Sequence, residues 1–169
     1  MKALVVYSTL TGNTKKIAEG VFSAFDGQAE CFDVKDAPAP DGYDLIVPGF
    51  WVDRGHADDA MLAFMEKIKN KKIAFFFTLG AYPDSEHAGE VAADTEKRLK
   101  ENGNEVLGHF RCQGKVDPKL LESMKKLPAD HPHAQMTEER KARLDEAAKH
   151  PDEKDVANAA DFMKKVLAA

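Results

Sequence analysis

The sequence predicts an α/β fold, a doubly wound sheet of five parallel strands in the order 2-1-3-4-5 with helices on both faces. Apolar runs of strand length alternate with segments of helical periodicity through residues 2–112. The run at residues 72–78 is almost wholly apolar, as expected for a strand covered on both faces. A polar turn separates the first strand from the first helix, at the edge where sheets of this kind bind ligands.

The first two strands follow from short runs at the start of the chain. Residues 2–7 are mostly apolar and rich in β-branched side chains, which predicts a buried strand. The next helix is amphipathic, with Ile17 and Val21 on its apolar side. Residues 28–34 are predicted to form the second strand, which ends in a loop rich in proline and glycine at residues 35–42.

The middle of the chain repeats this alternation. The third strand is predicted at residues 43–50, where Pro48-Gly49 breaks it. Residues 57–69 carry apolar side chains at helical spacing, which predicts a helix. The remaining elements of this part are a strand at residues 72–78, a helix at residues 87–102 and a fifth strand at residues 105–112.

Residues 113–152 depart from the alternation, and we interpret them as an insertion over the strand ends rather than a second domain. A short helix is predicted at residues 119–126, and a charged helix that opens with a capping box is predicted at residues 137–150. The last helix starts at Pro151 and carries an apolar stripe that should cover the sheet. We therefore expect one domain, residues 1–169.

Composition limits the partners of the chain. Its net charge is −5 and it has no basic tract, which argues against nucleic acid and anionic membranes as partners. No segment approaches the roughly eighteen apolar residues of a membrane span, so we expect no membrane insertion. Met1 leads directly into a predicted strand, so we expect no signal peptide. Cys31 and Cys112 suit a reducing cytoplasm as free thiols, with a disulfide between them as the less favoured alternative.

Hydroxyl, amide and glycine residues fill the turn after the first strand, residues 8–14, except at Leu10. The first N–H groups of a helix lack internal partners and the helix dipole is positive there, so this turn predicts an anion site. The turn has neither the lysine of a nucleoside-triphosphate loop nor the glycines of a dinucleotide loop. A single phosphate monoester therefore fits best, and the alternative is a helix cap that binds nothing.

The string from Thr9 to Thr14 also resembles, in full, the T/S-x-T-G-N-T phosphate loop of flavodoxins, which holds the ribityl phosphate of FMN. The resemblance covers residues 1–111 and the last helix, and it implies a flavodoxin-like fold with FMN as the cofactor. Ser8 replaces the glycine of many flavodoxins, and we expect its hydroxyl to lie near the phosphate. The cofactor contacts implied for this loop are Ser8, Thr9, Leu10, Thr11, Gly12, Asn13 and Thr14.

Two further loops at the same sheet edge complete the site that the resemblance implies. The only tryptophan, Trp51, can stack on an isoalloxazine ring, or Phe50 can do so with the tryptophan behind it. In flavodoxins the loop after the fourth strand supplies backbone N–H groups and a stacking tyrosine. Tyr82 resembles that tyrosine, the alternative being that it packs on Pro83. The residues assigned to these two loops are Gly49, Phe50, Trp51, Thr78, Leu79, Gly80 and Tyr82.

Charged residues near these loops predict an acidic rim around the flavin. Such a rim would make a negatively charged flavin costly and would steer a basic partner, whereas Arg54 and His56 would act in the opposite sense. Ordinary solvated charge is the alternative for any one of these carboxylates. The rim residues are Asp53, Asp58, Asp59, Asp84, Glu86 and Glu90. The histidines form no metal spacing, and no catalytic Ser-His-Asp or Cys-His arrangement is present, so we predict no metal site and no catalytic residue.

The sequence thus favours an FMN-binding electron-transfer flavoprotein that shuttles one or two electrons between protein redox partners, a reductase and an acceptor, as a monomer or weak dimer. The alternative is an enzyme, an FMN-dependent NAD(P)H oxidoreductase that reduces quinones or similar small acceptors. In that case residues 113–152 would shape the substrate pocket. The sequence leaves open whether the chain is an enzyme.

Overall fold

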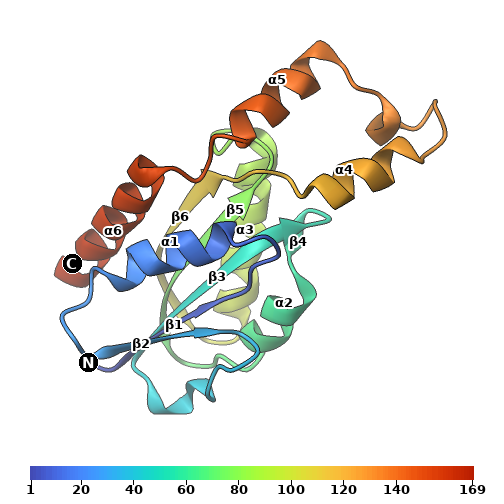
Figure 1. The fold of residues 1–169 in the computed structure, drawn as a ribbon. Coiled ribbons are helices and arrows are strands. Elements are labelled where there is room, and N and C mark those ends of the chain that lie inside the picture. Colours follow the sequence, from blue (N-terminus) through green and yellow to red (C-terminus); the bar gives the residue numbers. More distant parts are fainter.

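A computed structural model describes all 169 residues and contains one central sheet (Figure 1). Five parallel strands lie in the order β2-β1-β3-β5-β6, which confirms the predicted order 2-1-3-4-5. A sixth strand, β4, was not predicted and pairs with β3 in an antiparallel hairpin. The strands are β1 (Ala3–Tyr7), β2 (Ala29–Asp33), β3 (Leu45–Asp53), β4 (His56–Ala57), β5 (Lys72–Leu79) and β6 (Glu105–Gln113).

Helices cover both faces of the sheet, as predicted. One pair, α1 and α6, packs on one face, and α2 and α3 pack on the other. A 3-10 turn, η1, takes the place of a helix between β2 and β3. The helices are α1 (Asn13–Phe22), α2 (Asp59–Met65), α3 (Glu86–Glu101), α4 (Pro118–Lys125), α5 (Glu138–Ala147) and α6 (Glu153–Ala168), with 3-10 turns η1 (Pro40–Gly42) and η2 (Pro132–Ala134). None of these helices combines the length and the apolar character needed to cross a bilayer.

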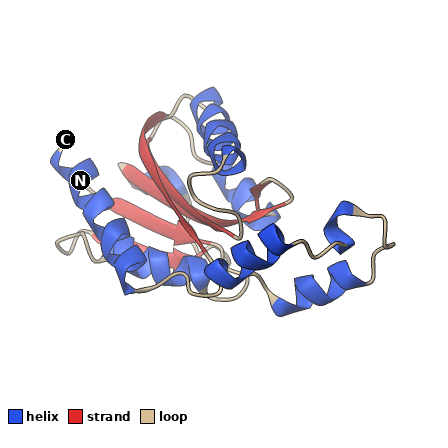
Figure 2. Ribbon diagram, turned by 90° about the horizontal axis from the view of Figure 1, so that it is seen from above, coloured by secondary structure: helices blue, strands red, loops and turns tan.

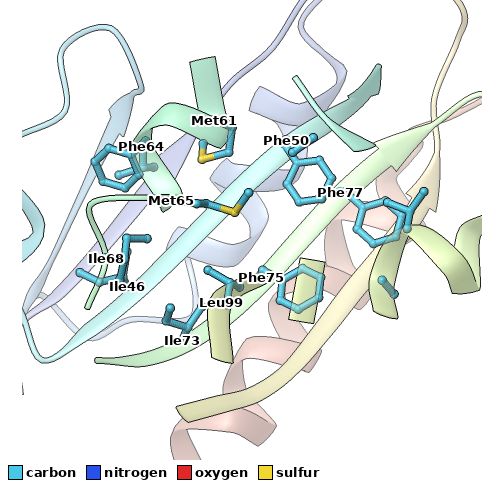
Figure 3. Packing of buried hydrophobic residues seen from close by; sticks show 14 of the residues in the cluster. Ile46, Phe50, Met61, Phe64, Met65, Ile68, Ile73, Phe75, Phe77 and Leu99 are labelled. Carbon is cyan, nitrogen blue, oxygen red and sulfur yellow. The ribbon is translucent and has the colours of Figure 1, made fainter. Parts of the chain in front are cut away.

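The three consecutive phenylalanines of β5 show why its sequence does not alternate. Side chains of a strand point to opposite faces in turn. Phe75 and Phe77 therefore enter the core beneath α2 and α3, while Phe76 enters the core beneath α1 and α6. All three are fully buried, and Phe77 stacks on Phe50 with ring centroids 5.2 Å apart (Figure 3). The two cores on either side of this strand fix the sheet edge on which the site is built.

The predicted break in the third strand is wrong, because β3 continues through Pro48 and Gly49 to Asp53. Pro48 pairs with β1, but the pairing between β3 and β5 skips this residue. The N–H that proline lacks is therefore not needed there, and the strand continues. Gly49 is required because a Cβ there would lie 2.0 Å from the ring of Phe76. The residues expected in a loop after position 49 are consequently held on a strand.

Residues 115–150, which we call the arm, leave the end of β6, form α4, η2 and α5, and return to α6. The arm projects from the carboxyl ends of the strands (Figure 2). At its base, the N–H of Lys115 donates to the carbonyl of His150 at 3.0 Å. Gln113 Nε2 donates to the carbonyl of Arg143 at 3.3 Å. The arm therefore stands at the sheet edge to which ligands of this fold bind.

Candidate functional site

A cavity of about 580 Å³ lies where the arm meets the carboxyl ends of the strands. Pockets of this size hold cofactors and small ligands. Its walls come from the loop after β1, the end of β3, the loop after β5 and the arm. The predicted cofactor residues that line it are Thr9, Leu10, Thr11, Asn13, Thr14, Trp51, Thr78, Leu79 and Gly80. Those that do not line it are Ser8, Gly12, Gly49, Phe50 and Tyr82.

The start of α1 forms one wall of the cavity and offers free backbone donors. Gly12 precedes the helix with φ +96°, and its N–H donates to the hydroxyl of Thr9 at 2.9 Å. No side chain caps the helix, and the N–H groups of Asn13, Thr14 and Lys15 have no acceptor within the protein. Three free N–H groups at the positive end of a helix dipole suit a phosphate.

Side chains of the same loop anchor it to its neighbours. The hydroxyls of Thr14 and Thr78 are 2.9 Å apart and buried, which ties the loop to the end of β5. Asn13 Nδ2 donates to the carbonyl of Lys115 at 2.9 Å, which ties the loop to the base of the arm. Gly114 admits this contact, because a Cβ there would lie 2.8 Å from Asn13 Nδ2. The cradle is thus held rigidly between the sheet and the arm.

The expectation that the Ser8 hydroxyl lies near the phosphate is wrong. Ser8 is buried, and its hydroxyl donates to Asp58 Oδ1 at 2.7 Å. Asp58 also accepts from the N–H of Met61 at 3.2 Å, which caps α2. Burial raises the pKa of Asp58, and its second oxygen, Oδ2, is buried without a partner. Asp58 is therefore an interior group and not part of a solvated rim.

Trp51 and Phe50 lie on opposite faces of β3. Phe50 has no exposed surface and belongs to the core beneath α2 and α3, whereas Trp51 is half-buried and lines the cavity. The backbone of Trp51 is fixed on two sides, since it pairs with Thr78 of β5 and accepts the N–H of Asp58 at 3.3 Å. Of the two aromatic candidates, Trp51 is the one that a bound flat ring can reach.

The end of β5 and the loop after it contribute Leu79, Gly80 and Ala81 to the cavity but not Tyr82. A Cβ on Gly80 would lie 2.6 Å from a methyl of Val116, so this glycine makes room for the arm as well as for any ligand. Tyr82 is 40% exposed and lines a separate hollow beside Glu146 and His150. The structure therefore does not bring Tyr82 together with Trp51.

The charge of the cavity differs from the predicted acidic rim. Of the six predicted carboxylates, only Asp53 lines the cavity, joined there by Asp117. The cations that line it are Arg54, Lys115, Arg140 and Arg143. Three of these four belong to the arm, which is far from the other walls in sequence. Sequence reasoning missed them because only the fold of residues 113–152 brings them to the cavity.

The cysteines lie away from any partner thiol. Cys112 is buried at the end of β6 and Cys31 is half-buried on β2, and both are free. Burial raises the pKa of both thiols, that of Cys31 to about 11. A thiol with a raised pKa is poorly nucleophilic near neutral pH, which argues against a redox role for either residue.

A family model described as a flavodoxin domain matches residues 4–164. The flavodoxin-like domain-containing protein BilS of Clostridioides difficile is 33% identical to this chain, over 99% of the chain and 97% of that protein. BilS of Clostridium symbiosum is 26% identical over 96% of the chain and 94% of that protein. Both relatives therefore match the full length of the chain, including the arm.

Solved structures share the fold. Oxidised flavodoxin 1 of Bacillus cereus superposes with a TM-score of 0.63 at 17% identity, covering 99% of this chain and 98% of that one. A flavoprotein of Lactobacillus acidophilus in complex with FMN superposes with a TM-score of 0.53 at 20% identity, covering 65% of this chain and 92% of that one. The doubly wound sheet is the feature that these proteins have in common.

Proposed function

The chain belongs to the flavodoxin family, and we propose that it is an electron carrier that binds FMN in the cavity between the start of α1, Trp51 and the arm. It would accept one or two electrons from a reductase and pass them to a protein acceptor. Bound FMN supplies the redox chemistry, while the protein supplies binding, orientation and electrostatics.

The observation that carries this proposal is that Asn13 and Thr14, whose N–H groups at the start of α1 are free, line the same cavity as Trp51. The N–H groups fit a phosphate, and the indole offers a large flat apolar surface for a ring. The backbone of Leu79 and Gly80, which also lines the cavity, would contact the edge of the ring. The residues present therefore fit FMN.

The cations of the cavity would tune the bound cofactor. Four arginine and lysine side chains line it against two aspartates, so negative charge is favoured there. A flavin that gains an electron without a proton becomes negative. We therefore infer that Lys115, whose carbonyl accepts from Asn13 of the cradle, eases reduction of the flavin, in contrast to the effect expected of an acidic rim.

The phosphate assignment is tested by titrating the apoprotein with FMN and with riboflavin, which lacks the phosphate. Thr11 lines the cavity and its hydroxyl has no partner in the protein. Thr11→Ala should lower FMN affinity by about tenfold, the effect of one hydrogen bond to a charged group, and leave riboflavin affinity unchanged. Equal losses for both ligands would show that the loop does not hold the phosphate.

The oxidoreductase alternative has one observation in its favour. The cavity continues beyond the FMN cradle onto α4 and α5 of the arm, which leaves a wall for a second small molecule. Mixing the purified holoprotein with NADH or NADPH without oxygen separates the two functions. Flavin reduction by the nucleotide alone supports an enzyme, and reduction only after a flavoprotein reductase is added supports a carrier.

A further inference from the structure

The arm side of the cavity is chemically unlike the cradle at α1. Its surface is mainly apolar, contributed by both helices of the arm and by the segment that leads to them. The apolar side chains are Val116, Leu120, Leu121, Met124 and Leu144. One of them, Leu120, remains 45% exposed although it lines the cavity. Exposed apolar surface beside a cofactor pocket indicates a place for a further apolar group.

Cations sit among these apolar side chains without counterions. None of the ion pairs in the structure includes Lys115, Arg140 or Arg143. The guanidinium of Arg140 instead donates to the carbonyls of His133 and Gln135, which fixes its position. These bonds to neutral carbonyls leave its positive charge without compensation.

The guanidinium group of Arg143 is the strongest single indication that a ligand binds on the arm side. Its Nε–H is buried and has no hydrogen-bond partner in the protein. A buried donor without an acceptor is costly, and such groups in native proteins call for an explanation. The terminal guanidinium nitrogens are not buried and also make no hydrogen bond within the protein, and because Arg143 lines the cavity, they are the donors that an acceptor on a bound molecule would reach.

The two nearby carboxylates already have partners. Asp117 accepts from the N–H of Lys119 at 3.0 Å as the cap of α4. Asp53 lies 3.6 Å from Arg54. Two carboxylates do not balance the four cations that line the cavity, and the excess of positive charge favours a ligand that brings its own negative charge.

We propose that the arm side of the cavity binds an amphipathic organic anion, a compact apolar molecule with one carboxylate or sulfonate group. The anionic group accepts from Arg143 in the charge-assisted geometry that guanidinium groups favour, and the apolar body lies against the leucines of α4 and α5. The inference rests on the proposed function in one respect, that FMN occupies the cradle at α1 and leaves this side free.

Two probes with the same ring system test the proposal on the FMN-loaded protein. Anilinonaphthalene sulfonate is anionic, and phenylnaphthylamine has the same rings without the sulfonate. Isothermal titration calorimetry should give one site per chain for the sulfonate, with at least tenfold weaker binding of the neutral probe. Arg143→Gln should weaken sulfonate binding about tenfold or more and leave the neutral probe unchanged.

Three further measurements make the result decisive. Arg98→Gln removes the same charge from α3, outside the cavity, and should leave both probes unaffected. Arg143→Lys keeps the charge but loses the Nε–H, and should give an intermediate loss. FMN affinity should be the same in Arg143→Gln as in the parent protein.

Equal binding of the two probes, or sulfonate binding that Arg143→Gln leaves unchanged, would overturn the proposal. A loss of FMN affinity in Arg143→Gln would overturn it as well, because Arg143 would then serve the cofactor. Failure of the parent apoprotein to bind FMN would refute the proposed function instead. If that apoprotein still bound the sulfonate, and if Arg143→Gln abolished this binding, the arm site would exist independently of FMN.

Discussion

The hydroxyl of Ser8 and the carboxylate of Asp58 are joined in the interior at 2.7 Å, although the residues are 50 positions apart. This bond connects the loop after β1 to the first turn of α2. Ser8→Ala would leave the buried carboxylate with less compensation and should lower the free energy of unfolding by about 1–3 kcal/mol, measured by urea denaturation. Ser23→Ala, at an exposed serine that bonds only to the carbonyl of Gly20, is the control and should change it by less than about 0.5 kcal/mol.

The same carboxylate should give stability a defined pH dependence. Burial raises the pKa of Asp58 above its ordinary value of 3.8, so the folded protein holds this proton when the unfolded chain has released it. Its contribution to stability therefore falls as pH rises from 3.8 through the raised folded pKa, and is constant above that. The unfolding free energy of the parent minus that of Asp58→Asn should fall across this window. A difference that is constant or rises with pH would contradict this account.

Substitutions at Trp51 and Phe50 should affect different properties, the first flavin binding and the second stability. Trp51→Leu removes a partly exposed ring from the cavity and should weaken FMN binding roughly tenfold or more, with little change in stability. Phe50→Leu removes part of a stacked pair in the core and should cost about 1 kcal/mol or more of stability, with FMN affinity retained. Fluorescence titration and urea denaturation of both variants provide the measurements. An inverted pattern would place Trp51 among the packing residues.

The side chain of His150 should hold the base of the arm most strongly when it is protonated. Its Nδ1 lies 2.6 Å from Asp155 Oδ2 and its Nε2 lies 3.1 Å from Glu146 Oε1. The hydrogen bond to Asp155 is the main cause of its raised pKa, so the stabilisation is fully present below the ordinary pKa of 6.5. It is lost as pH rises through the raised folded pKa.

The difference in unfolding free energy between the parent and His150→Gln should therefore be largest below pH 6.5 and should shrink above it. We expect a maximum on the order of 1 kcal/mol for this partly exposed group. The protection of α5 amides against hydrogen exchange in the parent, relative to His150→Gln, should likewise be largest below pH 6.5 and should decrease above it.

Local patterns explain why much of the fold could be predicted from sequence. The apolar runs and helical spacings of residues 2–112 depend on nearby residues, and they gave the five parallel strands in the observed order. The predicted break at Pro48-Gly49 failed because its outcome depends on tertiary contacts. Pro48 meets a gap in the ladder, and Gly49 meets the ring of Phe76 on another strand.

The candidate site likewise combines residues that the local sequence predicts with residues that only the tertiary fold brings to the cavity. The loop from Thr9 to Thr14 is contiguous, so its place at the cavity could be predicted from the sequence. Tyr82 was misplaced because the turn after β5 carries its side chain to the hollow beside His150, and the local sequence does not distinguish this path from one into the cavity. Arg140 and Arg143 were missed because α5 reaches the cavity only through the path of the arm.

The hydrogen bond between Lys115 and His150 has a consequence for how the fold tolerates change. The chain leaves the sheet after β6 and returns beside the same point, where Lys115 bonds to His150. The arm between these two residues is therefore a loop whose ends are held together. Neither the strand order nor the two cores depend on it. We therefore expect substitutions in α4 and α5 to leave the strand order and the two cores intact, so that changes within this single segment would alter what binds on the arm side of the cavity.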